Sequence, residues 1–400
     1  MHVLIVNNLY PPIMAGGAEL IVRNLAEGLA ARGHRVTAVT ICGPEMEPYP
    51  EERTGGVDII RFFPKNVFWS FARTGRPAWQ KALWHLKDSW NRDAARRLGA
   101  IMRNAPPDVM HTHVVDGFSA SIWRRARMLG VPVVHTAHDY HLLCPRAFML
   151  DRNWNLCTNP SMKCRVFRKW HLGTTRHLNA FVSPSQFLLD QHIAAGLDVP
   201  VTAVVPNGIP VTAAAHPPQA DTTATANFLL AARLTTEKGI LVAIEAMNHL
   251  TDLPGIRLTI AGRGPIEDAV RAAAARDPRI QFVGYISGEE KDRHFRAADA
   301  LLIPSLWYEN APVIIVEAAA YGIGVVGSKI GAIPEFIRDG ETGLLFEAGN
   351  SAGLASALRR IMAEPSLRQR FADNAGSVMG RFTIDGMVNH YLDQYRAVAA

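Results

Sequence analysis

Two glutamates eight positions apart are the first residues whose types and spacing suggest chemistry. Glu309 and Glu317 flank an apolar run in which Asn310 predicts a helix N-cap, Pro312 a first-turn residue and Gly322 the end of the helix. Glu309 is then expected in the loop before the helix and Glu317 two turns inside it. A helix N-terminus suits an anion, because its N–H groups are unpaired and carry partial positive charge. Carboxylates beside it could accept hydrogen bonds from hydroxyls of the molecule that carries the anion, a phosphorylated sugar or nucleotide. The alternative is a buried helix with two surface glutamates.

Two cations, Arg233 and Lys238, follow a predicted strand. An arginine fork and a lysine point charge can both reach one diphosphate, although two solvated loop cations are the plainer interpretation. The chain contains no Asp-x-Asp pair, the common means of holding a divalent ion on a nucleotide diphosphate. A helix dipole contributes only about 0.3–2 kcal/mol, so the two side chains must supply most of the neutralisation.

His138 follows the apolar segment Val131–Val134, and a histidine at the carboxyl end of a central strand is well placed to contact a substrate. A metal site is the alternative. It would draw on neighbouring histidines, one aspartate and three cysteines: His135, His141, His171, Asp139, Cys144, Cys157 and Cys164. No Cys-x-x-Cys or His-x-x-x-His spacing supports that alternative, and we expect no metal.

Gly16 and Gly17 lie between a predicted strand and a predicted helix. Glycines there allow the backbone to approach a ligand, with the helix N-terminus behind them. The pattern is weak on its own, since many strand–helix turns contain glycine without binding anything.

The elements that must position these residues alternate between strand and helix, which predicts parallel sheets with both faces covered. The first half has apolar strand candidates at 3–6, 36–41, 57–62, 109–112, 131–136 and 180–182, and a helix at 20–32. The second half restarts the scheme with strands at 228–231, 258–260, 280–283, 300–303 and 324–326, a loop at 235–239 and a helix at 240–250. The proline-containing and Ala/Thr-rich segment 206–226 is the expected linker. We expect a cleft at the carboxyl ends of two facing sheets.

Size and composition bound the remaining possibilities. The 400 residues favour two domains, and 48% hydrophobic residues suffice for a core in each. Four cysteines do not suggest a disulfide framework. The net charge of +6 permits an anionic partner without naming one. The start of the chain is typical of a strand and not of a secretory signal, so we expect a cytoplasmic protein.

Residues 61–103 mix cations with many aromatic residues. We interpret them as a helical pair packed on the sheet. The alternative is a basic, aromatic surface that lies peripherally on the inner face of an anionic membrane.

The chain resembles the retaining glycosyltransferases of family 4 over almost its whole length. The resemblance rests on a series of short motifs in a fixed order: Tyr10-Pro11-Pro12 with Gly16-Gly17-Ala18-Glu19, Arg32-Gly33-His34, His138-Asp139-Tyr140, Ser183-Pro184-Ser185, Val205-Pro206-Asn207-Gly208, Arg233-Leu234 with Glu237-Lys238-Gly239, Gly262-Arg263-Gly264-Pro265, Phe282-Val283-Gly284, Glu309 to Glu317, and Gly340-Glu341-Thr342-Gly343. Each motif is modest alone, and their order is specific for the family but not for the sugar.

The resemblance implies a GT-B fold, an α/β architecture of two Rossmann-like, doubly wound parallel-sheet domains facing a central cleft. Residues 1–205 would bind the acceptor, residues 206–380 the nucleotide sugar, and the helix in 381–400 would return to the first domain. His138 and Glu309 would be catalytic. The donor would be bound by Gly16, Gly17, Arg233, Lys238, Asn310, Ala311, Val313 and Glu317, with no metal and no cofactor. Two departures from the family pattern, Ala232 and Pro312 in place of glycines, put the donor contacts in doubt.

The resemblance further implies transfer of a sugar from a nucleotide-diphosphate sugar to a hydroxyl of a glycan or lipid-linked acceptor, with retained configuration. The alternatives are a nucleotide-sugar epimerase of the same fold and a non-catalytic sugar-nucleotide-binding protein. A sugar phosphorylase would need a place for a cofactor or inorganic phosphate, for which the sequence has no motif. No nucleic-acid partner is expected.

Overall fold

The chain forms two compact units in a computed structural model. It describes residues 1–14, 16–50, 52–69, 71, 75–151, 154–210 and 225–399. The first unit comprises Met1–Ala147, Ser161–Ile209 and Thr383–Ala400, and the second comprises Phe148–Pro160 and Pro210–Phe382. Each unit is built on its own sheet.

The first unit contains an eight-stranded sheet in the order β3-β4-β2-β1-β5-β6-β7-β8. All neighbouring strands are parallel except the β3–β4 pair. The strands are β1 His2–Val6, β2 Arg35–Ile41, β3 Glu52–Thr54, β4 Val57–Phe62, β5 Val109–Thr112, β6 Val133–Thr136, β7 Ala180–Ser183 and β8 Val201–Val204. The order reverses between β1 and β5, so the loops after these two strands meet where α/β sheets bind ligands.

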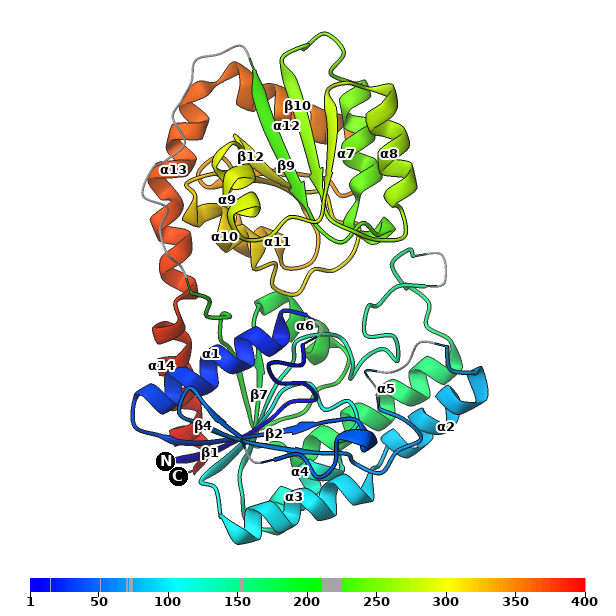
Figure 1. Ribbon diagram of the computed structural model, residues 1–400, viewed down its shortest axis with the longest axis vertical. Helices are drawn as coiled ribbons and strands as arrows, with labels where there is room; N and C mark the ends of the chain where they lie inside the picture. The colour runs from blue at the N-terminus through cyan, green and yellow to red at the C-terminus, as the bar shows by residue number, and fades with distance from the viewer. Residues whose placement is uncertain are drawn as a thin grey trace. The chain divides into compact units, whose positions relative to one another are not determined.

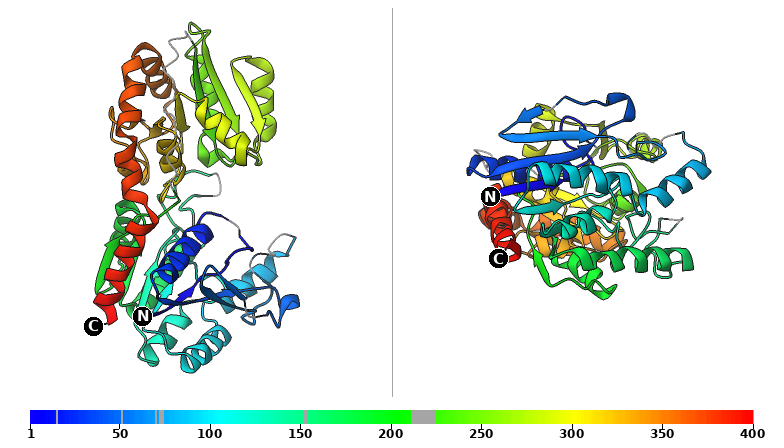
Figure 2. Two further views of the ribbon diagram at one scale, coloured as in Figure 1. Left: turned by 60° about the vertical axis from the view of Figure 1, so that its left-hand side comes forward. Right: turned by 90° about the horizontal axis from the view of Figure 1, so that it is seen from below.

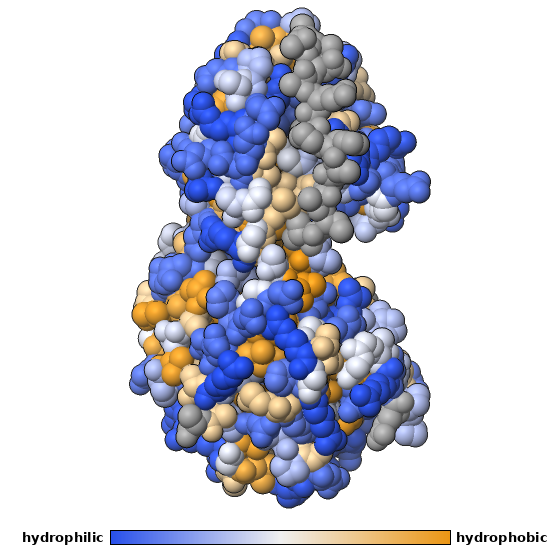
Figure 3. All heavy atoms as spheres, turned by 90° about the vertical axis from the view of Figure 1, so that its left-hand side faces the viewer, coloured by the Kyte–Doolittle hydropathy of each residue, from blue (hydrophilic) through white to orange (hydrophobic). Residues whose placement is uncertain are grey.

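Helices cover both faces of this sheet, with α1 on one side and α3 and α4 on the other (Figure 1). They are α1 Ala18–Ala31, α2 Ala78–Asp88, α3 Arg92–Asn104, α4 Ser121–Met128, α5 Met162–Thr174, α6 Gln186–Ala194 and α14 Ile384–Ala399, with short 3-10 segments at Pro44–Met46 and Thr175–His177. The last helix lies in the first unit, where Tyr391 and Tyr395 are fully buried. Figure 3 shows that apolar side chains on the α14 side of this unit form small patches among hydrophilic ones.

The second unit contains a six-stranded, fully parallel sheet in the order β11-β10-β9-β12-β13-β14. Its strands are β9 Ala226–Ala231, β10 Ile256–Ala261, β11 Ile280–Gly284, β12 Ala300–Ile303, β13 Gly324–Ser328 and β14 Gly343–Phe346. The order reverses between β9 and β12. The loops after these two strands therefore lie side by side at the carboxyl edge of the sheet.

The helices of the second unit are mostly short. They are α7 Ile240–Asn248, α8 Glu267–Arg276, α9 Gly288–Arg296, α10 Ile314–Ala320, α11 Ile333–Phe336, α12 Ser351–Ala363 and α13 Pro365–Met379, with 3-10 segments at Thr236–Lys238 and Gly380–Phe382. The core joins buried aliphatic strand residues to α7, α12 and α13, and it includes the fully buried rings of Phe228 and Phe371.

The predicted fold class, alternating strands and helices with parallel sheets, is confirmed. Every predicted strand is present within about two residues of its expected bounds. Three strands were not predicted: β3, β8 and β14, each of which forms an edge of its sheet. The predicted loop 235–239 contains a 3-10 turn, and most of the predicted linker, residues 211–224, lies outside the described residues.

Residues 61–103 contain the predicted helical pair, α2 and α3, while residues 70 and 72–74 are not described. Helix α3 buries Ala94, Leu98 and Met102 and packs against α4. Helix α2 buries Trp84, whose ring stacks on Phe68. None of the described helices has the length and apolarity needed to cross a membrane.

Candidate functional site

Glu309 is the centre of a polar cluster in the second unit. Its side chain is buried, and its Oε1 atom accepts hydrogen bonds from Lys238 Nζ at 2.7 Å, Ser305 Oγ at 2.7 Å and Trp307 Nε1 at 2.8 Å. The Lys238 ammonium also lies 5.0 Å from the centre of the Trp307 ring. A carboxylate held by three donors, one of them charged, is fixed in position.

The loops after β9 and β12 bring Lys238 and Glu309 together. Glu237 accepts a backbone hydrogen bond from Leu306 at 2.8 Å, which ties the two loops. Gly239 has a φ of +70°, and a Cβ atom there would overlap the Pro304 carbonyl, so only glycine allows this close approach. The meeting of the two loops follows from the reversal of strand order between β9 and β12.

Arg233 lies on the same loop as Lys238, and its guanidinium is 63% exposed. Its nearest charged partner is Glu237, 3.9 Å from the guanidinium, and it donates no side-chain hydrogen bond within the described part of the chain. Glu237 itself is buried and accepts from Thr235 Oγ1 at 2.6 Å. Arg233 is therefore an exposed cation beside the largely buried Lys238.

Helix α10 begins later than the sequence predicted, so the prediction of Asn310 as its N-cap is wrong. The N-cap is Val313 and not Asn310, and the first turn closes when the Ile315 amide donates to the Pro312 carbonyl at 3.0 Å. The cause is Pro312, because a residue before proline is pushed out of the α region and Ala311 cannot begin a helix. The loop therefore continues to Val313.

The late start also corrects the place of Glu317, which lies in the first turn of α10 and not two turns inside it. Its Oε2 accepts from Lys291 Nζ of α9 at 2.8 Å, and both side chains are about one-third exposed. The amides of Ala311 and Val313, just before the helix, donate to no backbone acceptor among the described residues. The N–H groups that could bind an anion therefore belong to the loop that precedes α10.

Gly16 and Gly17 lie at the N-terminus of α1 in the first unit. The Gly16 amide donates to Glu19 Oε2 at 2.9 Å, and Gly17 is the N-cap with φ −82°. A Cβ atom on Gly17 would meet no described atom within 4 Å. Neither sterics nor backbone conformation therefore requires glycine at position 17.

His138 follows β6, and its Nε2 atom lies 2.9 Å from Nδ1 of His113, which follows β5. Burial lowers the pKa of His138 from 6.5 to about 4 and lowers the pKa of His113 well below 6.5. Both rings are neutral at pH 7, so one nitrogen of the pair donates and the other accepts. His113 thus fixes the ring of His138.

The residues named for a metal site are only partly neighbours, such as His141 and His171, whose ring centres lie 5.3 Å apart. Thr112 Oγ1 is 2.9 Å from His135 Nδ1, and Asp139 accepts from the His141 amide at 2.8 Å. The four cysteines are free thiols. Within the described ranges, no group of three or more His, Cys, Asp or Glu side chains is arranged to hold a metal ion.

Comparison with known proteins identifies the family. The Glycosyl transferase 4-like domain matches residues 16–208, and the Glycosyl transferases group 1 family matches residues 215–378. Glycogen synthase of Mycobacterium tuberculosis is 30% identical over 385 residues, which cover 93% of this chain and 88% of that protein. The chain belongs to the family 4 glycosyltransferases. Phosphatidyl-myo-inositol mannosyltransferase of Mycobacterium leprae is 25% identical over 392 residues, covering 96% of this chain and 94% of that protein.

Solved structures show that this family 4 glycosyltransferase has the GT-B fold. Sucrose-phosphate synthase from Thermosynechococcus elongatus matches with a TM-score of 0.75 at 20% identity, covering 99% of this chain and 98% of that one. Anabaena HepE in complex with UDP matches with a TM-score of 0.74 at 17% identity, covering 99% and 100%. The predicted family and fold are thereby confirmed.

The predicted site residues fall into two groups, one in each unit. Gly16, Gly17 and His138 lie at the carboxyl edge of the first sheet, and the others lie at the carboxyl edge of the second: Arg233, Lys238, Glu309, Asn310, Ala311, Val313 and Glu317. The structure joins Lys238 directly to Glu309. Sequence reasoning missed Ser305, Trp307, Lys291 and His113. Ser305 and His113 follow the ends of β12 and β5, a position that could have singled them out, whereas nothing in the spacing indicated Lys291.

Proposed function

We propose that this glycosyltransferase moves a sugar from a nucleotide-diphosphate sugar to a hydroxyl of a glycan or lipid-linked acceptor, with retained anomeric configuration. The observation that supports this most is the 2.7 Å pair between Lys238 and Glu309 at the reversal point of the second sheet. It places a cation for phosphate and a carboxylate for sugar hydroxyls side by side.

The donor diphosphate would be held by Lys238 and Arg233. An ammonium group has three N–H donors, of which one is used on Glu309, so two remain for phosphate oxygens. The exposed guanidinium of Arg233 can bind two oxygens at once. The loop amides of Ala311 and Val313 add neutral donors. These fixed dipoles and charges would stabilise the leaving diphosphate without a metal ion.

The transferred sugar and the donor ribose would be bound by the two glutamates. All three donors to Glu309 converge on Oε1, so Oε2 remains to accept from a sugar hydroxyl. Glu317 would accept from the ribose, with Lys291 holding its carboxylate in place. Asn310 lies between Glu309 and the amides of the loop and would complete the donor site.

The first unit, residues 1–147 and 161–209 with the returning helix α14, would bind the acceptor. His138, neutral at pH 7, would contact the donor sugar near the reacting carbon. The absence of any steric need for glycine at 17 supports the approach of the donor to the backbone there. Gly16 would shape the same turn, since its amide is tied to Glu19.

In the proposed reaction, the bond between the anomeric carbon and the diphosphate oxygen breaks through an oxocarbenium-like state. The acceptor oxygen forms its bond on the same face, and its proton passes to the leaving phosphate. Glu309 is the candidate for a covalent nucleophile, but three donors on its carboxylate favour a purely electrostatic role.

A lipid-linked acceptor would bring the protein to the inner face of the cytoplasmic membrane. Peripheral contact with that membrane is part of this proposal, and residues 61–103 are the segment for which the sequence suggested it.

The test begins with thermal unfolding in the presence of UDP-, GDP- and ADP-sugars, starting with UDP-glucose, the compound bound to Anabaena HepE. A donor at 100 times its Kd stabilises the folded state by about 2.7 kcal/mol. Turnover is then followed as nucleotide release with and without an oligoglucan or a lipid-linked acceptor, and the anomeric proton coupling of the product is measured by NMR.

The expected result is acceptor-dependent release and a product with the donor's configuration. Equal release without acceptor would favour the epimerase, and stabilisation without turnover would favour a non-catalytic binder.

A further inference from the structure

Helix α5 presents an apolar stripe to solvent. Met162, Val166 and Trp170 are spaced four residues apart and are 71%, 61% and 50% exposed. The opposite side of the helix is anchored by the buried residues His171 and Leu172. A helix on a protein surface normally turns its polar side outward, so this stripe needs an explanation.

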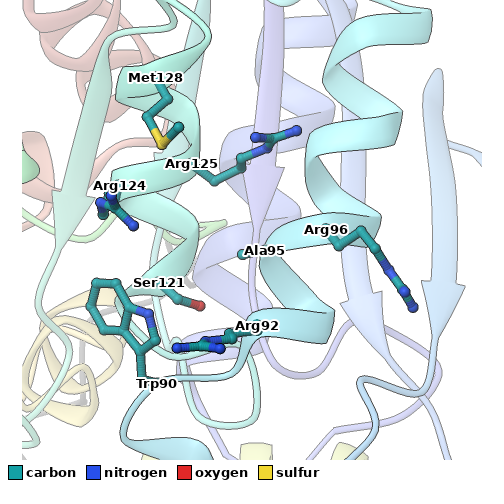
Figure 4. A pocket seen from close by; sticks show the side chains of 8 residues that line it. All are labelled: Trp90, Arg92, Ala95, Arg96, Ser121, Arg124, Arg125 and Met128. Carbon is teal, nitrogen blue, oxygen red and sulfur yellow. The ribbon is translucent and has the colours of Figure 1, made fainter.

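The stripe continues onto neighbouring elements. Three hollows in the first unit share residues, so they adjoin one another. The first hollow, shown in Figure 4, and the second share Trp90 and Arg124; the second and the third share Val166 and Trp170. Trp90 and Trp170 are also in edge-to-face contact, with ring centres 6.1 Å apart. We call the surface formed by Trp90, Met162, Val166 and Trp170, with the cations between them, the α5 face.

Helix α2 adds a second stripe. Trp79, Leu83 and Leu86 recur at helical spacing and are 65%, 39% and 70% exposed. Helices α2 and α5 lie side by side (Figures 1 and 2), and both line the third hollow. At the far end of the first hollow, Met128 of α4 is also exposed (Figure 4).

The charges of these helices have one sign. Helices α2, α4 and α5 together carry nine lysine and arginine residues: Lys81, Lys87, Arg124, Arg125, Arg127, Lys163, Arg165, Arg168 and Lys169. Their one carboxylate, Asp88, is buried and accepts from the Gly117 amide at 2.9 Å. Arg124 and Lys169, which line the second hollow, form no ion pair with another described residue.

We propose that the α5 face docks the protein on an anionic lipid bilayer. Exposed aliphatic and tryptophan side chains flanked by cations fit the boundary between lipid headgroups and acyl chains. Each lysine or arginine near such a surface is attracted to anionic lipid. A second copy of the chain would bring these like charges together, which opposes self-association. Nucleic acid would use the cations but would not cover the apolar stripe.

The assignment differs from the sequence-based alternative for residues 61–103. Of that range, α2, residues 89–92 and the first turn of α3 border the surface, and its centre is α5, about 60 residues later. Docking concerns a surface other than the donor site, so it can succeed or fail independently of the proposed sugar transfer.

The experiment is flotation of the full-length protein with two kinds of vesicle. One contains phosphatidylcholine alone, and the other contains phosphatidylcholine with about one-third phosphatidylglycerol, an anionic lipid. We expect binding to the anionic vesicles only, with at least a tenfold loss in partition coefficient for Val166→Asp and for Arg124→Glu with Lys169→Glu. Binding should also weaken as salt rises. The matched control is Ile193→Asp on α6, where another β-branched residue is 48% exposed in the same unit.

No binding by the wild type, or equal losses for Val166→Asp and Ile193→Asp, would overturn the proposal. So would a dimer in sedimentation that Val166→Asp dissociates while vesicle binding is absent. Nucleotide release measured with a water-soluble acceptor should be unchanged in Val166→Asp, which shows that the variant is folded and separates docking from catalysis.

Discussion

Lys238 and Glu309 lie 71 residues apart in the sequence and form an ion pair of 2.7 Å. Their side chains are only 18% and 9% exposed, so the pair is largely removed from water. It forms because β9 and β12 are neighbours although β10 and β11 separate them along the chain. The pair therefore depends on the topology of the sheet. The same two side chains contribute to the stability of the second unit and to the proposed donor site.

Removal of the Glu309 carboxylate should destabilise the second unit. In Glu309→Ala, the Lys238 charge and the Ser305 and Trp307 donors lose their shared acceptor, and breaking a buried pair typically costs about 3–5 kcal/mol. Glu309→Gln keeps an acceptor oxygen and should lose less stability but still lose at least 100-fold in turnover. Urea unfolding and steady-state kinetics measure the two effects. Equal unfolding free energies for wild type and Glu309→Ala would contradict the described cluster.

Arg233→Ala should weaken binding of the nucleotide-sugar donor without affecting the fold. Its guanidinium is exposed and contributes little to stability, so the unfolding free energy should change by about 0.5 kcal/mol or less. Loss of a bidentate phosphate contact should raise the donor Kd at least tenfold in calorimetry. The matched control is Arg271→Ala, which removes another arginine that is 62% exposed and paired with a glutamate four residues away. Equal donor affinities in the two variants would argue against a role for Arg233.

Gly17→Ala should lower activity while leaving the stability of the fold almost unchanged. The backbone angles at position 17 suit alanine and a Cβ atom meets no described neighbour, so the unfolding free energy should change by about 1 kcal/mol at most. If the donor approaches the backbone there, kcat/KM for the donor should fall at least tenfold. Gly376→Ala on α13, where a Cβ also meets nothing within 4 Å, serves as the control. Full activity in Gly17→Ala would contradict a role for Gly17 in donor binding.

Buried histidines should make the first unit sensitive to mild acid. Burial lowers the pKa of His138 and His192 to about 4, and the pKa of His135 and His171 to about 3. The unfolded chain, with values near 6.5, binds more protons than the folded chain. The stability from these groups is therefore present above pH 6.5 and is lost as the pH falls toward 4.

The urea midpoint should accordingly be lower at pH 5 than at pH 7, and His192→Gln should reduce the difference. A urea midpoint at pH 5 that equals or exceeds the midpoint at pH 7 would contradict the conclusion that these histidine rings are buried and neutral. The same burial predicts that kcat shows no ionisation of His138 near pH 6.5.

The fold was largely predictable because buried parallel strands are short apolar runs. Val109–Thr112 and Ala300–Ile303 were located at the bounds that the structure gives. The missed strands β3, β8 and β14 are at sheet edges, where one side of each strand has no neighbouring strand. Glu52–Thr54 illustrates the difficulty, since all three of its residues are polar.

The candidate site was predictable only where a residue follows a strand or belongs to a motif. Arg233, Lys238 and Glu309 satisfy one or both conditions. The Lys291–Glu317 pair joins two helices at positions that local spacing does not connect. Likewise, convergence of Ser305 and Trp307 on one oxygen depends on loop conformation. The start of α10 differs from the predicted start because Pro312 delays it to Val313.

The most direct test of the proposed diphosphate site is kcat/KM for the donor in Lys238→Ala, at saturating acceptor, with circular dichroism to confirm folding. The control is Lys329→Ala, which removes a lysine paired with Glu347 at 3.2 Å on the same unit. We predict a fall of at least 100-fold for Lys238→Ala and less than twofold for the control. A value for Lys238→Ala within threefold of wild type would contradict a role for Lys238 in holding the leaving diphosphate.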